Sequence, residues 1–189
     1  MNKHKPQSVG DLVGNGANVR LIRTWLESWD RVHLQGGKPP LGGGSRGGKP
    51  QDLGRKAVLL CGPPGVGKTT LAKRFGQWCF PSVKRAQMSP DMMPMDLTGG
   101  YALNRTSNEL VLRKGPVFAG CLVVDELNRA PGRVHATLLE AMEEGQVSIE
   151  GETFRLDDGL CVLATLNPEE VSGTYVITSA LLDRFSIDL

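Results

Sequence analysis

The sequence predicts an α/β protein of three layers, in which a parallel sheet of about five strands lies between helices and two β-hairpins are inserted. Short apolar runs alternate with helical patterns along the chain, and this alternation is typical of parallel strand pairing. A glycine-rich turn joins the first apolar run to a helical pattern. Two later segments alternate around polar turns, as the strands of hairpins do.

Two segments precede the first predicted strand. NVRLIRTWLESWDRV, residues 18–32, has apolar residues at three- and four-residue steps and predicts an amphipathic helix that Asn18 can cap. Residues 35–54 are rich in Gly and Pro and have few apolar residues. We expect a flexible loop there, because such a segment cannot bury enough surface to order itself.

The remaining elements follow from apolar runs and their spacing. The predicted strands are residues 57–61, 82–88, 121–124, 160–165 and 186–189. The predicted helices are residues 68–78, 134–145 (closed by Gly145) and 179–185. The predicted hairpins are DLTGGYALNRTSNELVLRKG, which turns at RTSN, and QVSIEGETFRL, which turns at Glu150 and Gly151.

The composition fits one globular domain over residues 1–189. The chain is 40% hydrophobic and 22% charged, and its net charge of +2 argues against nucleic acid as a partner. No apolar run approaches the roughly 20 residues that span a bilayer, and the start MNKHKPQS lacks the apolar core of a signal peptide. The four cysteines show no metal-ligand spacing, so we expect free thiols and a cytoplasmic location.

The glycine-rich turn is GPPGVGKT, residues 62–69, and it matches G-x-x-x-x-G-K-[ST] in full. Its glycines allow successive N–H groups to point at phosphate oxygens, and the next helix adds its N-terminal partial charge. Lys68 would reach the β- and γ-phosphates, and the Thr69 hydroxyl would bind Mg²⁺. The sequence therefore predicts a P-loop for ATP and Mg²⁺. Its predicted nucleotide-binding residues are Gly62, Pro63, Pro64, Gly65, Val66, Gly67, Lys68, Thr69 and Thr70.

Two adjacent acids end the apolar run in CLVVDELNRAP. In P-loop folds, such a strand runs beside the P-loop strand and ends near the same phosphates. We therefore expect Asp125 to hold Mg²⁺, through water, and Glu126 to polarise the attacking water.

Two further polar residues fit this geometry. Asn167 follows the strand LCVLAT, where its amide could orient the lytic water; a turn-forming Asn before Pro168 is the alternative. Arg184 is poorly placed for its own nucleotide but could reach a neighbour's γ-phosphate in a ring, as an arginine finger. The alternative for Arg184 is a surface pair with Asp183.

With these residues in view, the chain resembles an AAA+ ATPase. Residues 82–189 resemble the MoxR family in SPDMMPMDLTGGY, in GPVFAGCLVVDELNRAPGRVHATLLEAMEEGQVSIEGETF and in LATLNPEEVSGTY with ALLDRF. The resemblance implies Asp125 and Glu126 as Walker B, Asn167 as sensor 1 and Arg184 as the finger. It also implies that the two hairpins are the helix-2 and pre-sensor-1 inserts, similar to those that line the pore of minichromosome maintenance helicases.

Residues 8–75 resemble a different family, the large subunit of replication factor C, in SVGDLVGNGANVRLIRTWLESWD and AVLLCGPPGVGKTTLA. We expect a fusion or chimaera whose seam lies between Thr70 and Ser82. In both families the region of Val13 and Gly14 resembles the segment that contacts adenine. AAA+ proteins usually continue into a helical lid, whereas this sequence stops at Leu189, so we expect weak nucleotide binding and slow turnover.

The resemblance to MoxR implies an ATP-hydrolysing module that assembles as a ring, usually a hexamer, and remodels a partner or helps to insert a metal cofactor. Such modules often act with a von Willebrand factor A domain protein. A clamp-loader-like subunit that acts on DNA is one alternative. A nucleotide-binding module with little turnover is another, although the presence of Glu126 argues against it.

Overall fold

The structure is a computed structural model that describes the chain in part. The described residues are 57–62, 67–156, 160–167, 173–185 and 187–188, with Arg20, 23–25, 27–28, Val32 and 35–38 nearer the N-terminus. The chain divides into two compact units, residues 1–54 and 55–189. Several predicted features lie outside the described residues: Val13 and Gly14, most of the loop at 35–54, and Pro63, Pro64, Gly65 and Val66 of the glycine-rich turn.

The first unit contains the helix predicted near the N-terminus, and its described residues from 20 to 28 are helical. Thr24 Oγ1 donates to Arg20 O at 3.0 Å, and Ser28 Oγ donates to Trp25 O at 2.9 Å. Trp25 is buried, as expected for a residue on the apolar face of an amphipathic helix. The predicted helix is confirmed at these positions.

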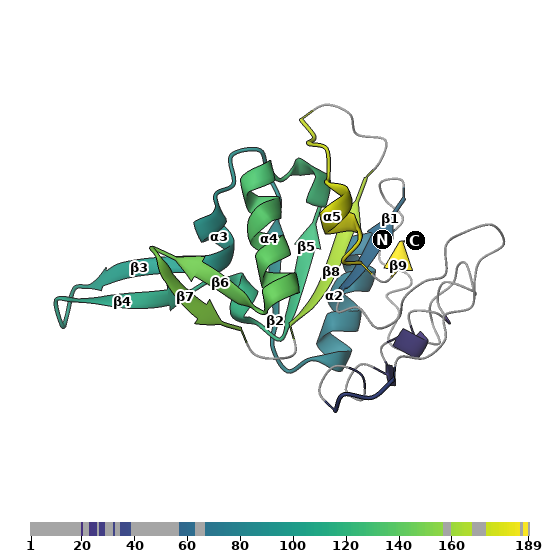
Figure 1. The fold of residues 1–189 in the computed structure, drawn as a ribbon, viewed down its shortest axis with the longest axis horizontal. Coiled ribbons are helices and arrows are strands. Elements are labelled where there is room, and N and C mark those ends of the chain that lie inside the picture. The colour runs from purple at the N-terminus through teal and green to yellow at the C-terminus, as the bar shows by residue number, and fades with distance from the viewer. Residues whose placement is uncertain are drawn as a thin grey trace, which may run out of the picture. The chain divides into compact units, whose positions relative to one another are not determined.

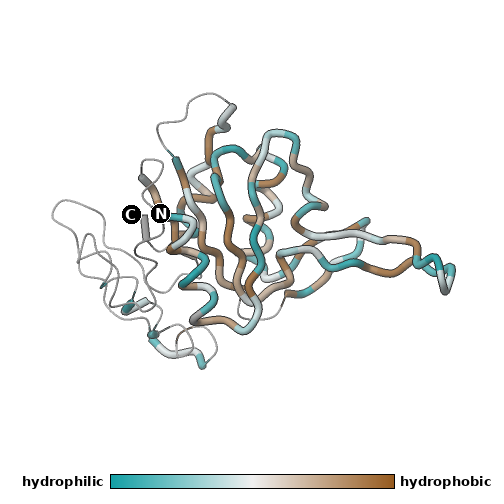
Figure 2. The backbone as a smooth tube through the Cα atoms, turned by 180° about the vertical axis from the view of Figure 1, so that it is seen from behind, coloured by the Kyte–Doolittle hydropathy of each residue, from teal (hydrophilic) through white to brown (hydrophobic). Residues whose placement is uncertain are grey.

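A parallel sheet forms the centre of the second unit (Figure 1). Among the described residues its strands are β1 (Ala57–Cys61), β2 (Val83–Gln87), β5 (Cys121–Asp125), β8 (Cys161–Leu166) and β9 (Ile187–Asp188), in the order β2-β5-β8-β1-β9. Every neighbouring pair is parallel, which confirms the predicted parallel sheet. The expectation that β5 runs beside the P-loop strand β1 is wrong, because β8 lies between them. Figure 2 shows hydrophobic residues along the central strands, and all five residues of β5 are buried.

Helices cover both faces of this sheet, so the unit has the three predicted layers. α2 (Lys68–Cys79) packs against β5 and β8 on one face. α4 (Gly132–Glu144) lies on the other face, in front of the sheet in Figure 1. Its Val134 and Leu138 join a buried apolar core with Leu122 of β5. Successive residues of a strand point to opposite faces, so each buried strand serves both layers of helices.

Two short helices differ from the prediction. α3 (Pro94–Thr98) includes residues 96–98, which the sequence predicts as the start of a hairpin strand. Pro94 fits the first turn of a helix, and the Met93 N–H donates to Asp96 Oδ2 at 2.8 Å, so local capping favours a helical turn here. α5 (Ser179–Leu182) ends three residues before the predicted boundary. The described chain also has two 3₁₀ turns, η3 (Pro116–Phe118) and η4 (Leu127–Arg129).

Both predicted hairpins are confirmed. β3 (Gly99–Asn104) pairs antiparallel with β4 (Glu109–Lys114), and this hairpin extends away from the central sheet in Figure 1. β6 (Gln146–Ile149) pairs antiparallel with β7 (Glu152–Arg155) directly after α4. The two hairpins are linked where Tyr101 Oη donates to Glu152 Oε2 at 2.8 Å.

The base of the β3–β4 hairpin requires glycine. Gly99 has φ of 78° and ψ of −163°, a region of backbone conformation that is essentially closed to other residues. A Cβ on Gly99 would also lie 1.9 Å from Arg113 O. The hairpin can therefore leave the body of the unit at this angle only because position 99 has no side chain.

We predict that Gly99→Ala lowers the free energy of unfolding by at least about 2 kcal/mol, because the backbone conformation is strained for alanine and the added methyl meets a carbonyl oxygen. The measurement is equilibrium unfolding in urea. Gly132→Ala is the matched control, because a Cβ at Gly132 would meet nothing within 4 Å. Equal stability of the two variants would contradict the prediction.

Candidate functional site

Three parallel strands end together at one edge of the central sheet. In the register of the sheet, Cys61 lies beside Leu166, and Val124 lies beside Ala164. The carboxyl ends of parallel strands form the edge at which open α/β sheets bind ligands. The turn after β1, the acids at the end of β5 and Asn167 after β8 are therefore brought to the same edge.

The glycine-rich turn is described at its two ends. Gly62 has φ of 150° and Gly67 has φ of 87°, conformations that glycine adopts most readily. Lys68 Nζ donates to Gly62 O, so the lysine side chain folds back over the turn. Thr69 and Thr70 lie in the first turn of α2, where backbone N–H groups have no partner within the helix and the helix dipole is positive. This end of α2 suits a phosphate group.

Asp125 is the last residue of β5 and is 1% exposed. Its Oδ1 accepts a hydrogen bond from Thr165 Oγ1 at 3.2 Å. Its Oδ2 accepts from Arg85 Nε at 2.5 Å, which makes an ion pair between β5 and the neighbouring strand β2. A buried carboxylate is costly unless it is paired and hydrogen-bonded, and Asp125 has both kinds of partner.

Glu126 turns away from Asp125. Its φ of 57° lies in the left-handed region, and its N–H donates to Thr165 Oγ1 at 3.0 Å. Its Oε2 accepts from Gln87 Nε2 at 2.9 Å and from Arg129 Nη1 at 3.0 Å. The Glu126 side chain is 36% exposed, against 2% for Asp125, so the adjacent acids occupy different environments.

Sequence reasoning missed the residues that hold the two acids. Arg85 and Gln87 are two positions apart in β2, so they share one face of the strand. Gln87 lies beside Asp125 in the register of β2 with β5. The polar residues Arg85 and Gln87 at alternate positions of one strand could have indicated partners for the acids. The sequence does not show, however, which strand neighbours β5. Arg129 and Thr165 are the other two missed partners.

Asn167 is held by its backbone at the same edge. Asn128 Nδ2 donates to Asn167 O at 3.0 Å, and Asn128 O accepts from the Tyr175 N–H at 2.7 Å. Asn128 is itself only 8% exposed. This asparagine, which the sequence analysis did not single out, connects the turn after β5 with the chain that follows β8.

Arg184 lies apart from the other predicted site residues. Its Nη2 donates to Glu143 Oε1 and forms an ion pair with it, rather than with Asp183. Glu143 is near the end of α4, and α4 begins shortly after the two acids. A helix rises about 1.5 Å per residue, so this arginine is on the order of 15 Å along α4 from the acids of its own chain.

The donor set at the edge fits Mg²⁺. The Thr69 hydroxyl and the Asp125 carboxylate are hard oxygen ligands, which this ion prefers, and Mg²⁺ commonly combines one or two protein ligands with substrate phosphates and waters. Within the described part of the chain, no group of three or more His, Cys, Asp or Glu residues could hold a metal ion. A cation at this edge would therefore complete its coordination with phosphate oxygens or water.

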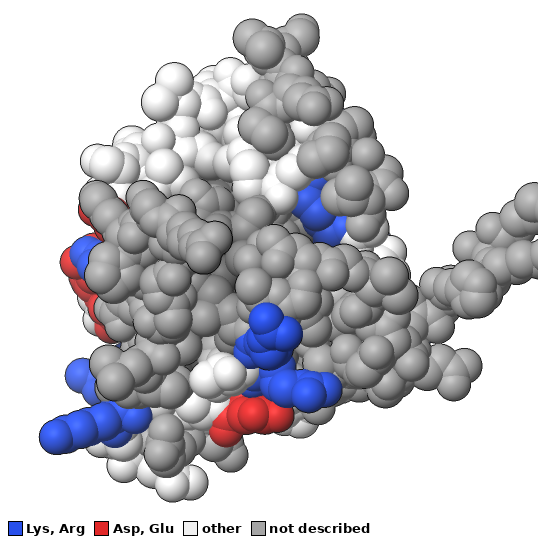
Figure 3. Space-filling model, turned by 90° about the vertical axis from the view of Figure 1, so that its right-hand side faces the viewer, with Lys and Arg blue, Asp and Glu red and all other residues white. Residues whose placement is uncertain are grey.

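Among the described residues, no helix combines the length and the apolar character needed to cross a bilayer. Among the residues that are coloured in Figure 3, both Lys or Arg and Asp or Glu side chains are present. The four cysteines are free, as the sequence predicted.

The fold and this edge define an α/β protein of the P-loop class. Residues 57–187 match the family described as "ATPase family associated with various cellular activities (AAA)". The chain therefore belongs to this AAA family, and the predicted resemblance to AAA+ ATPases is confirmed.

Individual relatives agree with the MoxR resemblance. The uncharacterized protein YeaC of Bacillus subtilis is 41% identical over 137 residues, which are 72% of this chain and 43% of YeaC. The chaperone MoxR1 of Mycobacterium tuberculosis is 41% identical over 133 residues, which are 70% of this chain and 35% of MoxR1. The crystal structure of a provisionally named ATPase from Cytophaga hutchinsonii has 38% identity and a TM-score of 0.59, and the match covers 69% of this chain and 39% of that one. The chain thus spans less than half the length of these relatives.

The second resemblance is also confirmed. Replication factor C subunit 1 of Oryza sativa is 43% identical over 76 residues, which are 40% of this chain and 7% of that protein. The chain is therefore similar to two kinds of protein. The fusion and its seam between Thr70 and Ser82 stay predictions.

We predict that Thr165→Val destabilises the protein by about 1–3 kcal/mol, because it removes one hydroxyl that serves both Asp125 and the Glu126 N–H. Valine keeps the shape of threonine, so the loss reports the hydrogen bonds. Urea unfolding measures it, with Thr165→Ser as the control that restores the hydroxyl. If Thr165→Val were as stable as the unchanged protein, Thr165 would not be holding the two acids.

Proposed function

We propose that this chain is a Mg²⁺-dependent ATPase module that binds ATP where β1, β5 and β8 end. Membership of an ATPase family supports the reaction in general. The observation that carries the proposal is the separation of two adjacent acids at the sheet edge where the glycine-rich turn also lies. Asp125 is in a buried ion pair, whereas Glu126 is in a partly exposed polar cluster. Two acids in different environments can take two different roles in one reaction.

Phosphate binding falls to the turn and the start of α2. Lys68 exchanges its hydrogen bond with Gly62 O for the β- and γ-phosphates, and Thr70 lies beside Thr69 in the same first helical turn. Pro63, Pro64, Gly65 and Val66 supply backbone contacts between Gly62 and Gly67 in this proposal, and Val13 and Gly14 contact the adenine. All of these assignments extend the sequence predictions.

Thr69 and Asp125 hold Mg²⁺ in this proposal. When bound, Mg²⁺ would offset the negative charge that develops on the phosphate groups. Thr165 and Arg85 each engage one oxygen of Asp125, so the carboxylate plane is fixed before any ligand arrives. Such outer partners orient metal ligands and tune their basicity.

Glu126 acts as the general base. Gln87 and Arg129 both donate to Oε2, which turns Oε1 toward the attacking water in this scheme. Glu126 takes a proton from the water as the water oxygen bonds to the γ-phosphorus and the bond to the β–γ bridging oxygen breaks. The products are ADP and phosphate. The Asn167 amide orients the water, and Asn128 holds the backbone of Asn167 in place.

Arg184 acts on a neighbouring copy of the chain. It lies far along α4 from the acids of its own chain and is 39% exposed, so it is open to a second protomer once its pair with Glu143 separates. This role requires a closed ring, for which we propose a hexamer in the cytoplasm. The printed name of the relative, chaperone MoxR1, supports chaperone-like work on a client protein. A von Willebrand factor A domain protein as partner extends the resemblance to the MoxR family and is part of the proposal.

The match to replication factor C carries a second candidate function, a clamp-loader-like subunit that acts on DNA. It covers a smaller share of the chain than the matches to YeaC and MoxR1. DNA binding that weakens steeply as salt rises would support this candidate, because phosphate contacts release counterions.

We predict that Lys68→Ala weakens MgATP binding by about 10- to 100-fold, the effect of losing a charged hydrogen-bond donor to phosphate. Isothermal calorimetry of the purified chain measures the affinity. Lys73→Ala, a change of the same kind on the same helix, should bind MgATP as the unchanged chain does. Equal affinities for the two variants would refute the assigned phosphate site.

We predict that Glu126→Gln lowers ATP turnover by about 100- to 10,000-fold and leaves MgATP binding intact, because the amide cannot accept the proton. Steady-state phosphate release and calorimetry together separate the two effects. Glu144→Gln, at the far end of α4, is the control and should keep full turnover. Turnover that survives Glu126→Gln would mean that another group serves as the base. An unchanged chain that binds MgATP without turnover would favour the nucleotide-binding module.

A further inference from the structure

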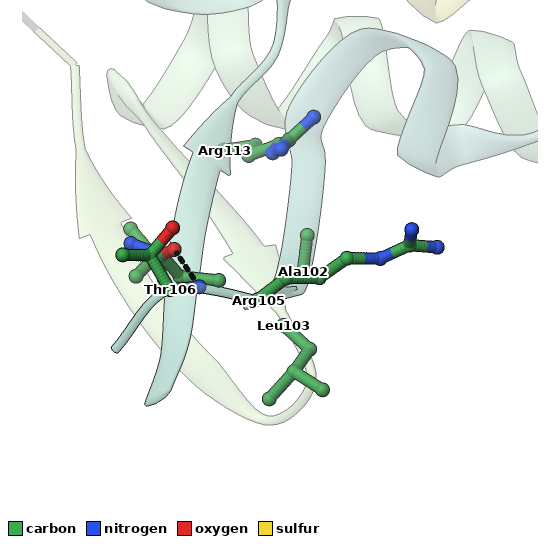
Figure 4. A pocket seen from close by; sticks show the side chains of 7 residues that line it. Ala102, Leu103, Arg105, Thr106 and Arg113 are labelled. Atoms are coloured by element: carbon green, nitrogen blue, oxygen red, sulfur yellow. Dashed lines mark hydrogen bonds between the residues drawn. The ribbon is translucent and has the colours of Figure 1, made fainter. Parts of the chain in front are cut away.

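The β3–β4 hairpin carries a pocket of about 420 Å³ near its tip. The register places Ala102 opposite Val111 and Gly100 opposite Arg113, so these residues share one face of the hairpin. Gly100 and Ala102 are small, which leaves space beside the longer side chains of β4. Arg105 enters the pocket lining from the turn, and Figure 4 shows Ala102 between Arg105 and Arg113.

The pocket is cationic. Neither Arg105 nor Arg113 forms an ion pair with another of the described residues. Residues 99–114 contain three cations, Arg105, Arg113 and Lys114, and one acid, Glu109, which is a net charge of +2. Lys114 is engaged over the Phe118 ring at 5.0 Å, so the two arginines are the cations available to a ligand. Guanidinium groups bind carboxylates and phosphates through paired hydrogen bonds.

The same hairpin exposes apolar side chains. Leu103 is 53% exposed, Leu110 is 69% exposed and Val111 is 44% exposed. Figure 2 shows this hydrophobic stretch between the body of the unit and the hydrophilic turn of the hairpin. Exposed apolar side chains beside unpaired cations suit a ligand that has both acidic and apolar groups.

The backbone of the hairpin favours an extended polypeptide as that ligand. Among the described residues β3 and β4 pair only with each other, so each strand has a free edge. A free edge can accept a further strand, and alternate side chains then reach pockets on one face. Single-stranded nucleic acid would be expected to stack on aromatic rings. Tyr101, the one aromatic residue in residues 99–114, is hydrogen-bonded to Glu152 instead.

We propose that the β3–β4 hairpin binds an extended acidic segment of a partner protein. A carboxylate of that segment lies between Arg105 and Arg113, and its backbone pairs with a free edge. Its alternating apolar side chains point to the other face of the hairpin and cover Leu103 and Leu110, which lie opposite each other in the register. This contact identifies the chemistry of the client and rests on the proposed remodelling function for its biological role. The binding itself requires no nucleotide.

Fluorescence anisotropy of a labelled peptide of alternating Glu and Val residues tests the proposal with the full chain. We expect Arg105→Glu and Arg113→Glu each to weaken binding by about tenfold or more, because each replaces an attractive charge by a repulsive one. Lys84→Glu on β2 makes the same change of charge away from the hairpin and should bind normally. Arg113→Lys should bind with intermediate affinity, because it keeps the charge and loses the paired geometry.

Three further measurements test which ligand the hairpin binds. A peptide with Gln in place of Glu should bind weakly; equal binding of the two peptides would overturn the role of the carboxylate. Tighter binding of a labelled single-stranded oligonucleotide than of the peptide would assign the surface to nucleic acid instead. A change in sedimentation of Arg113→Glu with unchanged peptide affinity would assign it to contacts between copies of this chain.

The same assay separates this inference from the proposed ATPase function. Peptide affinity is measured without nucleotide, in the unchanged chain and in Lys68→Ala. Peptide binding by a chain that does not bind MgATP would refute the ATPase proposal and leave the hairpin site standing. If the unchanged chain turns over MgATP but Arg105→Glu and Arg113→Glu bind the peptide as tightly as it does, the hairpin site is refuted and the ATPase proposal stands. Urea unfolding of the two variants checks that these exposed substitutions leave the fold intact.

Discussion

The site depends on one constraint: two adjacent carboxylates at the end of a buried strand must be kept apart. Asp125 is the last residue of the strand and its side chain is buried, with Arg85 and Thr165 stabilising its charge. Glu126 leaves the strand direction through a left-handed backbone conformation, which is unfavourable for a residue with a side chain. The hydrogen bond from its N–H to Thr165 helps to offset that strain and fixes the point at which the chain turns. One hydroxyl therefore holds both acids in separate environments.

This arrangement makes the site a property of the whole sheet. Asp125 depends on Arg85 of β2 and on Thr165 of β8, while Glu126 depends on Gln87 of β2 and on Arg129 after β5. Groups that share partners in this way are coupled energetically, so their contributions to stability are not expected to add. A ligand that changes the pairing of one acid would alter the surroundings of the other through the same side chains.

The β3–β4 hairpin differs from the central sheet in the side chains that it exposes. The sheet buries its strands on both faces, whereas β3 and β4 expose leucine, valine and arginine side chains at their far end. The base of that hairpin is fixed tightly by Gly99, so its free end is held at a defined angle to the unit. α4 leads from the turn after the acids to the second hairpin, and Tyr101 joins the two hairpins to each other. Helix α4 and the second hairpin thus connect the edge that carries the acids with the hairpin that projects from the unit.

The sequence by itself determined most of the element types, the glycine-rich turn, both hairpins and the order of the two acids, because these depend on local periodicity and on residue type. The short helix α3 is the exception, because local capping rather than periodicity sets it. The sequence also placed Asn167 directly after a strand that proved to end beside β5. Only the tertiary structure decided that β2 is the neighbour of β5, which brings Arg85 to Asp125 across 40 positions of sequence. The tertiary structure also decided three further contacts. These are the ion pair of Arg184 with Glu143, the hydrogen bond from Asn128 to Asn167 O, and the pocket that Arg105 and Arg113 both line. The physical reason is that strand neighbours and long-range side-chain contacts are selected by the packing of the whole core, and no local pattern in the chain records that choice.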